Sequence, residues 1–215
     1  MTAALIGLTA SAADEPGAWY SPGEAGEATV GRRYRDREIS IYKARRSPSS
    51  PATLVAALAT GELGQVVSIG AGLVNIRLAA ATVNGRVLAL EFDAGRFAAL
   101  KDAAQRGGVQ NLAGELVGTD LPALPTEPVD LVLIMDSYTS LTEPHALLGA
   151  LAQQLTPGGQ IALVEYRGED PSIMVPASRK LAQRDAEREL GEFGFKLLAN
   201  DDRLPLRHVM IFGRR

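Results

Sequence analysis

A glycine turn and a later acidic residue could together bind a nucleoside-containing cofactor. Gly70-Ala71-Gly72 follows the apolar run 66–69, and Glu91 ends a second apolar run 19 residues after Gly72. Glycines at the end of a buried strand let the backbone turn tightly and approach a ligand closely. A carboxylate at the end of the next strand can accept two hydrogen bonds from a ribose diol. The pattern indicates a cofactor site at the carboxyl edge of a sheet; the alternative is a packing turn beside an exposed Glu91.

Residues near the turn discriminate between cofactors. A nicotinamide-dependent oxidoreductase is expected to have a third glycine where Asn75 stands. None of the five tyrosines is followed four residues later by a lysine, as short-chain dehydrogenases require. A loop for S-adenosylmethionine commonly reads acid-x-Gly-x-Gly-x-Gly, and here Ser68 and Val74 replace the acid and the third glycine. Two glycines of that pattern therefore fit, in a degenerate form of the loop.

The elements that would position these residues alternate along the chain. Apolar runs typical of strands lie at 66–69, 86–91, 111–117, 129–135, 160–165, 196–199 and 208–212. Apolar residues three and four positions apart predict helices over 75–81, 94–105, 144–155 and 177–190. This order predicts an α/β fold with a doubly wound, Rossmann-like, mostly parallel seven-stranded sheet. No helix separates the last two strands, so we expect them to pair as a C-terminal antiparallel hairpin.

Motifs in the second half of the chain resemble those of class I S-adenosylmethionine-dependent methyltransferases. Leu155-Thr156-Pro157-Gly158-Gly159 before the run 160–165 resembles the turn before their fifth strand, and 129–133 resembles their fourth. The resemblance covers about residues 50–215. It includes the end of the chain, where a predicted helix is followed by Gly194-Phe195 and then by a predicted hairpin. It is closest to a bacterial, often exported subgroup, through the segment 164–171 and, loosely, 34–39.

The resemblance implies a role for each candidate site residue. The positions expected at the cofactor, S-adenosylmethionine, are Ser68, Gly70, Ala71, Gly72, Glu91 and Asp120. Asp120 would lie by the adenine amino group, or merely cap a turn. Asp136 and Tyr138 end the fourth strand and would be the catalytic residues, Asp136 as a base or an orienting group. Tyr138 would line the acceptor pocket, although a partly buried aromatic over the sheet edge is an equally simple interpretation.

Two functions remain open after this comparison. The first is methyl transfer to a small molecule by in-line displacement from S-adenosylmethionine. The second is a catalytically inactive binding or regulatory protein on the same fold. It is favoured by the missing acid at Ser68, by Val74, whose Cβ atom would crowd the methionine moiety, and by Thr139-Ser140 after the fourth strand. We expect His145 to be solvated and His208, Glu165 and Tyr166 to be structural.

Composition excludes several other classes. The 215 residues contain no cysteine and two histidines, so a cysteine-ligated metal, a thiol nucleophile or a histidine-rich metal site is not expected. A net charge of −3 argues against nucleic acid as a partner. No apolar run approaches the roughly 18 residues of a membrane span, so stable membrane insertion is not expected. A homodimer or a protein partner stays open.

The N-terminal quarter divides into two predicted segments before the domain over 50–215. Residues 1–31 predict a signal-like or mobile arm, because an apolar start runs into Ala10-Ser11-Ala12. That pattern favours export to the periplasm, whereas the missing basic start leaves a cytoplasmic location open. Residues 32–49 are rich in arginine and predict a basic arm that packs on the domain. Ser50-Pro51 predicts the start of a helix.

Overall fold

The computed structural model describes residues 54–55, 58, 62–120, 124–204 and 206–215. The arms predicted over 1–31 and 32–49, and the helix start at Ser50-Pro51, lie outside the described residues. None of the described helices is long and apolar enough to cross a membrane.

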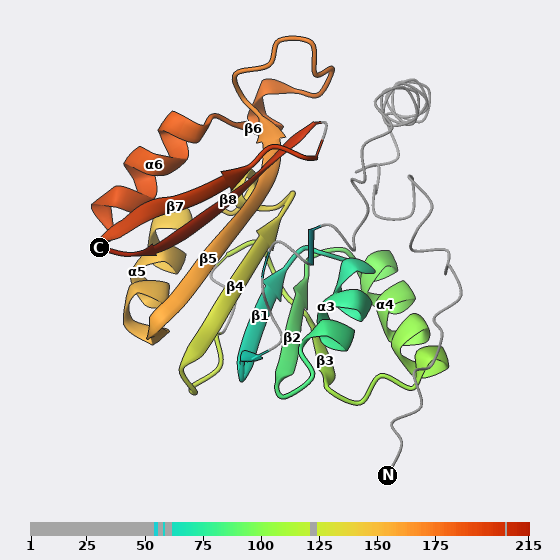
Figure 1. The fold of residues 1–215 in the computed structure, drawn as a ribbon. Helices are drawn as coiled ribbons and strands as arrows, with labels where there is room; N and C mark the ends of the chain where they lie inside the picture. The colour runs from blue at the N-terminus through green and yellow to red at the C-terminus, as the bar shows by residue number, and fades with distance from the viewer. Residues whose placement is uncertain (1–53, 56–57, 59–61, 121–123, 205) are drawn as a thin grey trace.

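One twisted sheet forms the centre of the domain (Figure 1). Its strands are β1 (Gln65–Ile69), β2 (Arg86–Glu91), β3 (Leu112–Leu116), β4 (Val129–Met135), β5 (Leu155–Arg167), β6 (Lys180–Leu181), β7 (Phe195–Asp201) and β8 (Arg207–Arg214). The order is β3-β2-β1-β4-β5-β8-β7, and the short β6 pairs with β5. The first five strands run parallel, while β8 is antiparallel to both β5 and β7. The predicted doubly wound sheet with a C-terminal antiparallel hairpin is thus confirmed.

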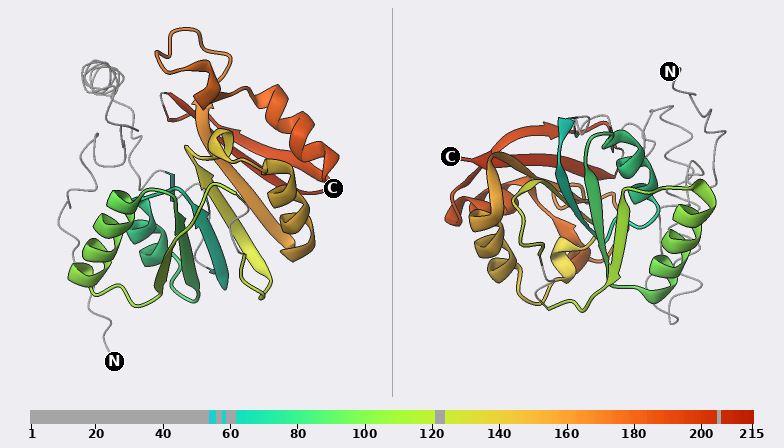
Figure 2. Two further views of the ribbon diagram at one scale, coloured as in Figure 1. Left: turned by 180° about the vertical axis from the view of Figure 1, so that it is seen from behind. Right: turned by 90° about the horizontal axis from the view of Figure 1, so that it is seen from below.

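Helices cover both faces of the sheet (Figure 2). They are α3 (Val74–Ala81), α4 (Ala94–Gly107), α5 (Pro144–Gln154) and α6 (Gln183–Glu192), with short 3-10 turns η3 (Tyr138–Ser140) and η4 (Ala177–Arg179). The apolar residues of β1, β4, β5 and β8 alternate between two buried clusters. One cluster lies under α3, and the other lies under α5 and α6. This alternation explains why the central strands read as continuous apolar runs.

Two elements start five or more residues away from their predicted starts, whereas the other predicted bounds differ by at most two residues. The helix expected over 177–190 begins only at Gln183, because Lys180–Leu181 pairs with Tyr166–Arg167 as β6 and Leu181 is buried. Strand β5 begins five residues early, at Leu155, which pairs with Val129. The register then shifts between Val129 and Leu131, so the glycine-rich turn is taken up as an irregularity within the strand.

The carboxylate of Asp130 fixes the opposite edge of the sheet. Its Oδ2 atom accepts hydrogen bonds from the backbone N–H groups of Gly64 (2.8 Å) and Gln65 (3.0 Å). Its Oδ1 atom accepts a 3.1 Å bond from the Thr156 hydroxyl. Burial acts to raise the pKa of Asp130, but these hydrogen bonds outweigh it and hold the pKa below its usual value. One side chain therefore joins the starts of β1, β4 and β5.

We predict that Asp130→Ala lowers the free energy of unfolding by about 1–3 kcal/mol, because two backbone donors lose their acceptor. Urea unfolding at neutral pH measures the change. The control is Glu127→Ala, which removes an exposed carboxylate that forms an ion pair with exposed Arg86 and a 3.5 Å hydrogen bond with the Thr126 hydroxyl; its loss is expected to cost less than about 0.5 kcal/mol. Equal stability of the two variants would contradict the role given to Asp130.

Candidate cofactor and acceptor site

The turn after β1 allows other groups to approach its backbone closely. Gly70 and Gly72 both adopt left-handed φ angles, 75° and 53°, which favour glycine. A Cβ atom on Gly70 would lie 2.7 Å from Ser137 Oγ and 2.9 Å from the carbonyl oxygen of Met135. Of the residues that the structure describes, a Cβ atom on Gly72 would meet none closer than Arg96, whose Cδ atom would lie 3.9 Å away. Gly70 therefore lets the end of β4 pack against the loop, and Gly72 leaves space beside its backbone.

The carboxylate of Glu91 lies against this loop. The side chain is fully buried, and its Oε1 atom accepts a 2.6 Å hydrogen bond from the Gly72 N–H. Burial raises the pKa of Glu91, while the charge of Arg96 and the Gly72 N–H oppose that shift without cancelling it. The Oε2 atom is buried and has no hydrogen-bond partner among the described residues. Such an unpaired acceptor suits a ligand hydroxyl, and Glu91 is not the exposed residue of the packing-only interpretation.

Arg96, in the first turn of α4, covers Glu91. Asp93 caps this helix by accepting a 2.7 Å hydrogen bond from the Arg96 backbone N–H. The Nε atom of Arg96 lies 3.7 Å from Glu91 Oε2, and its Nη1 atom lies 3.5 Å from the Gly70 carbonyl oxygen. The guanidinium group therefore lies beside the Glu91 oxygen that has no hydrogen-bond partner among the described residues.

The other residues predicted at the cofactor occupy different environments. Ser68 is fully buried in β1, and its Oγ atom has no hydrogen-bond partner in the described part of the chain. The side chains of Ala71 and Val74 belong to the core under α3. The side chain of Val74 packs inward and is 1% exposed, and the crowding expected from it stays a prediction. Asp120 is exposed in the loop after β3.

Asp136 is held by a buried arginine. Arg207, 1% exposed, donates from Nε and Nη2 to the two oxygens of Asp136 at 2.8 and 2.9 Å. It also donates a 2.6 Å bond to the Tyr166 hydroxyl, and its guanidinium lies 4.1 Å from that ring's centroid. Asp136 has a φ of 50°, a rare conformation outside glycine and asparagine. Both oxygens of Asp136 are thus hydrogen-bonded to Arg207, and the role of Asp136 as a base or an orienting group stays a prediction.

Glu165 and Glu189 hold the segment that contains Tyr138. Glu165 Oε1 accepts hydrogen bonds from the backbone N–H groups of Ser137 (3.0 Å) and Tyr138 (2.8 Å). The Tyr138 hydroxyl donates a 2.9 Å bond to Glu189 Oε2 on α6. Burial and these carboxylates raise the pKa of Tyr138 well above its usual value. Tyr138 is 3% exposed and lines a cleft of about 400 Å³ between η3 and α6. Its position therefore fits both a buried aromatic at the sheet edge and a residue that lines a pocket.

The structure joins two predicted groups and adds residues that were not among the predicted site residues. Gly72 contacts Glu91, and Gly70 contacts the β4 end that carries Asp136 and Tyr138. The additions are Glu165, Tyr166, Arg207 and His208. Only the antiparallel pairing of β8 with β5 brings the last two to this edge. Among the described residues, no group of three or more His, Cys, Asp or Glu side chains is placed to hold a metal ion.

An α/β sheet in this order, with a glycine turn after β1 and a buried acid after β2, defines a class I methyltransferase fold. Residues 67–163 match the family model described as a methyltransferase domain. No curated protein matches the sequence. The family-model match bears out the predicted resemblance: residues 67–163 carry a methyltransferase domain.

Solved structures share this fold at low sequence identity. A SAM-dependent methyltransferase from Aquifex aeolicus is 16% identical, with a TM-score of 0.67 over 80% of this chain and 96% of that one. A type 11 methyltransferase from Sulfolobus solfataricus is 16% identical, with a TM-score of 0.61 over 77% and 92%. The glycopeptide N-methyltransferase MtfA, solved with S-adenosylmethionine, is 18% identical, with a TM-score of 0.59 over 78% and 98%.

The buried carboxyl of Glu165 predicts pH-dependent stability. Burial and the nearby charge of Asp136 raise the pKa of Glu165 from 4.5 to about 8. Between these values the folded state holds a proton that the unfolded state has lost. The free energy of unfolding therefore falls as the pH rises through this interval, by at most about 1.4 kcal/mol per pH unit.

We expect Glu165→Gln, which keeps an acceptor but cannot titrate, to flatten this dependence. Urea unfolding at about pH 6 and about pH 8.5 compares the two proteins. The matched control is Glu127→Gln, which should retain the slope of the unaltered chain. An unchanged slope in Glu165→Gln would refute the assignment.

Proposed function

We propose that this protein is a methyltransferase that transfers a methyl group from S-adenosylmethionine to a small molecule by in-line displacement. The family match supports the reaction class. The observation that carries the proposal to these residues is the hydrogen bond from Gly72 to Glu91. It leaves the other Glu91 oxygen buried, 3.7 Å from Arg96 Nε and without a hydrogen-bond partner in the described part of the chain.

The residues present fit the cofactor that the family implies. Gly72 and Glu91 would hold the ribose hydroxyls, once Arg96 has moved aside. The buried hydroxyl of Ser68 offers a second unpaired polar atom next to the turn. When bound, the cofactor supplies an electrophilic methyl group on a positively charged sulfur. The chain then has only to bind and orient the reactants, since proximity and electrostatics carry most of the catalysis in such a displacement.

The size of the clefts supports a small-molecule acceptor. The clefts of about 400 and 630 Å³ at the carboxyl edge fall in the range that small ligands occupy. Tyr138 lies in the smaller one, directly after the strand that packs on Gly70. The rigid attachment of this segment through Glu165 and Glu189 would keep an acceptor in one orientation relative to the loop.

Calorimetric titration with S-adenosylhomocysteine tests the proposal. We expect micromolar affinity for the unaltered chain and a loss of about 1–3 kcal/mol in Glu91→Ala, because a buried hydrogen bond to the ligand is removed. The control Glu127→Ala should bind as the unaltered chain does. Absence of binding at millimolar ligand would favour the inactive binding or regulatory protein instead. Equal affinity in Glu91→Ala would remove Glu91 from the site.

A further inference from the structure

The chain leaves β4 through a residue in the left-handed region. Asp136, directly after the strand, has a φ of 50° and is the one residue other than glycine with a positive φ in the described part of the chain. This conformation is unfavourable for an L-amino acid, so contacts from the rest of the fold must hold it. The backbone N–H of Asp136 donates a 2.9 Å hydrogen bond to the carbonyl oxygen of Val164 on β5. The main chain is thus attached to β5, and the side chain is held separately.

The conformation of Asp136 sets the position of the two residues that follow it. The Ser137 hydroxyl donates a 3.0 Å hydrogen bond to the carbonyl oxygen of Ile69. Its Oγ atom would lie 2.7 Å from a Cβ atom on Gly70, so it packs directly on the glycine turn. Tyr138 lines the cleft of about 400 Å³ beside η3. A rotation of the backbone at Asp136 would therefore disturb both the glycine turn and this cleft.

Arg207 holds the carboxylate of Asp136 at two points. Its Nε and Nη2 atoms donate hydrogen bonds of 2.8 and 2.9 Å to the two oxygens. Contact of a planar guanidinium with both oxygens of a carboxylate fixes the orientation of the carboxylate as well as its distance. The side chains are 1% and 12% exposed, so solvent and salt screen this pair only weakly.

Arg207 is held on β5 by contacts that do not involve Asp136. It lies opposite Tyr166 in the antiparallel pairing of β8 with β5. Its Nη2 atom donates a 2.6 Å hydrogen bond to the Tyr166 hydroxyl, and its guanidinium carbon lies 4.1 Å from the centroid of that ring. The position of the guanidinium is therefore determined by strand pairing and by the aromatic ring beneath it.

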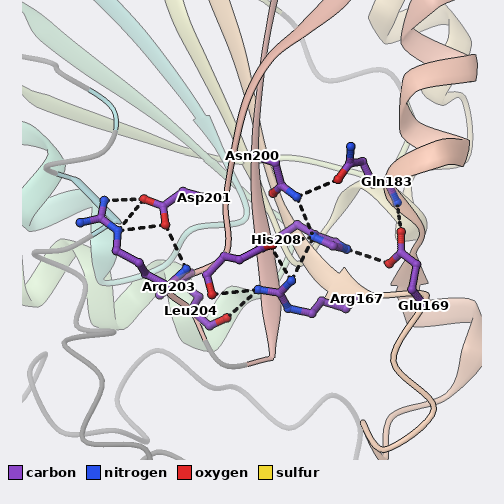
Figure 3. Close-up of polar contacts among 9 residues, drawn as sticks. Arg167, Glu169, Gln183, Asn200, Asp201, Arg203, Leu204 and His208 are labelled. Carbon is purple, nitrogen blue, oxygen red and sulfur yellow. Dashed lines mark hydrogen bonds and ion pairs between the residues drawn. The ribbon is translucent and has the colours of Figure 1, made fainter.

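The next residue of β8 secures the strand on the other face of the sheet, because neighbouring residues of a strand point to opposite faces. Figure 3 shows the side chain of His208 in a polar cluster with Arg167 and Glu169. Its Nε2 atom lies 2.8 Å from Glu169 Oε2. The start of β8 is thus fixed from both faces, which makes Arg207 the fixed partner and Asp136 the positioned one.

We propose that Arg207 is a positioning residue for the methyltransferase site. It touches neither reactant. It holds Asp136 in the left-handed conformation, and Asp136 in turn places Ser137 on the glycine turn. The consequence for the cofactor rests on the proposed function, whereas the effect of Arg207 on the turn is measurable without any ligand.

Amide hydrogen exchange of the full chain, followed by mass spectrometry, tests the effect on the turn. The backbone N–H groups of Gly72, Ser137 and Tyr138 are hydrogen-bonded and report on it. We expect Arg207→Met to speed exchange about tenfold in peptides covering 69–73 and 136–140, because the unfavourable conformation loses its support. A peptide covering 97–107 in α4 should exchange as in the unaltered chain, whereas a role in overall stability alone would speed all three alike.

A second substitution separates position from charge. Glycine adopts a φ of 50° without support, so Asp136→Gly combined with Arg207→Met should regain most of the slow exchange. Arg207→Lys keeps the charge but loses the two-point contact, and it gives the same local pattern if Arg207→Met does not fold. The control is Arg184→Met, at an arginine whose side chain is 89% exposed, and it should change none of the three peptides.

Calorimetric titration with S-adenosylhomocysteine then tests the consequence for the cofactor. We expect about tenfold weaker binding in Arg207→Met, following the loss of protection at the turn, and recovery in the combined variant. Arg184→Met should bind as the unaltered chain does.

Three outcomes overturn the proposal. They are equal acceleration of all three peptides, a combined variant that exchanges as fast as Arg207→Met, and unchanged affinity in Arg207→Met. Failure of S-adenosylhomocysteine to bind the unaltered chain is a different result. Together with the expected exchange pattern, it would refute the proposed function and leave the effect of Arg207 on the glycine turn supported.

Discussion

The close approach of two strand ends sets the geometry of the whole carboxyl edge. The Ser137 hydroxyl donates a 3.0 Å hydrogen bond to the carbonyl oxygen of Ile69, at the last residue of β1. This contact exists only because residue 70 has no side chain, since a Cβ atom there would overlap Ser137. The glycine turn and the start of η3 are therefore one packed unit. Any ligand held by the turn lies next to residues of the β4 end.

Buried polar and charged groups then tie the C-terminal strands to that unit. Arg207 at the start of β8 binds Asp136 at the end of β4, and Glu165 of β5 binds the two backbone N–H groups that follow. A buried arginine without its carboxylate is strongly unfavourable, so these three strand ends hold each other in place. The antiparallel strand β8 is thus part of the site and not merely an extension of the sheet.

The sequence predicted the sheet well because its strands are apolar runs and its helices amphipathic. It predicted less of the site, for reasons that particular residues show. The partners of Asp136 and Glu165 are distant in sequence and become neighbours only through strand pairing. The covering of Glu91 by Arg96 depends on the first turn of α4, whose side-chain direction the pattern does not specify. The predicted helix start at residue 177 was wrong, because the pairing of Lys180–Leu181 with β5 overrides the local helical periodicity.

The ion pair between Arg96 and Glu91 has a thermodynamic consequence for any ligand of the glycine turn. The guanidinium group is an internal competitor for the oxygen that a ribose hydroxyl would use. If Glu91 binds the ribose as proposed, only the fraction of molecules with Arg96 turned away is competent to bind, and the apparent dissociation constant rises in inverse proportion to that fraction. Because the pair is electrostatic and Arg96 is partly exposed, ionic strength would change the competent fraction as well. On that proposal, the conformation of one side chain sets part of the cofactor affinity.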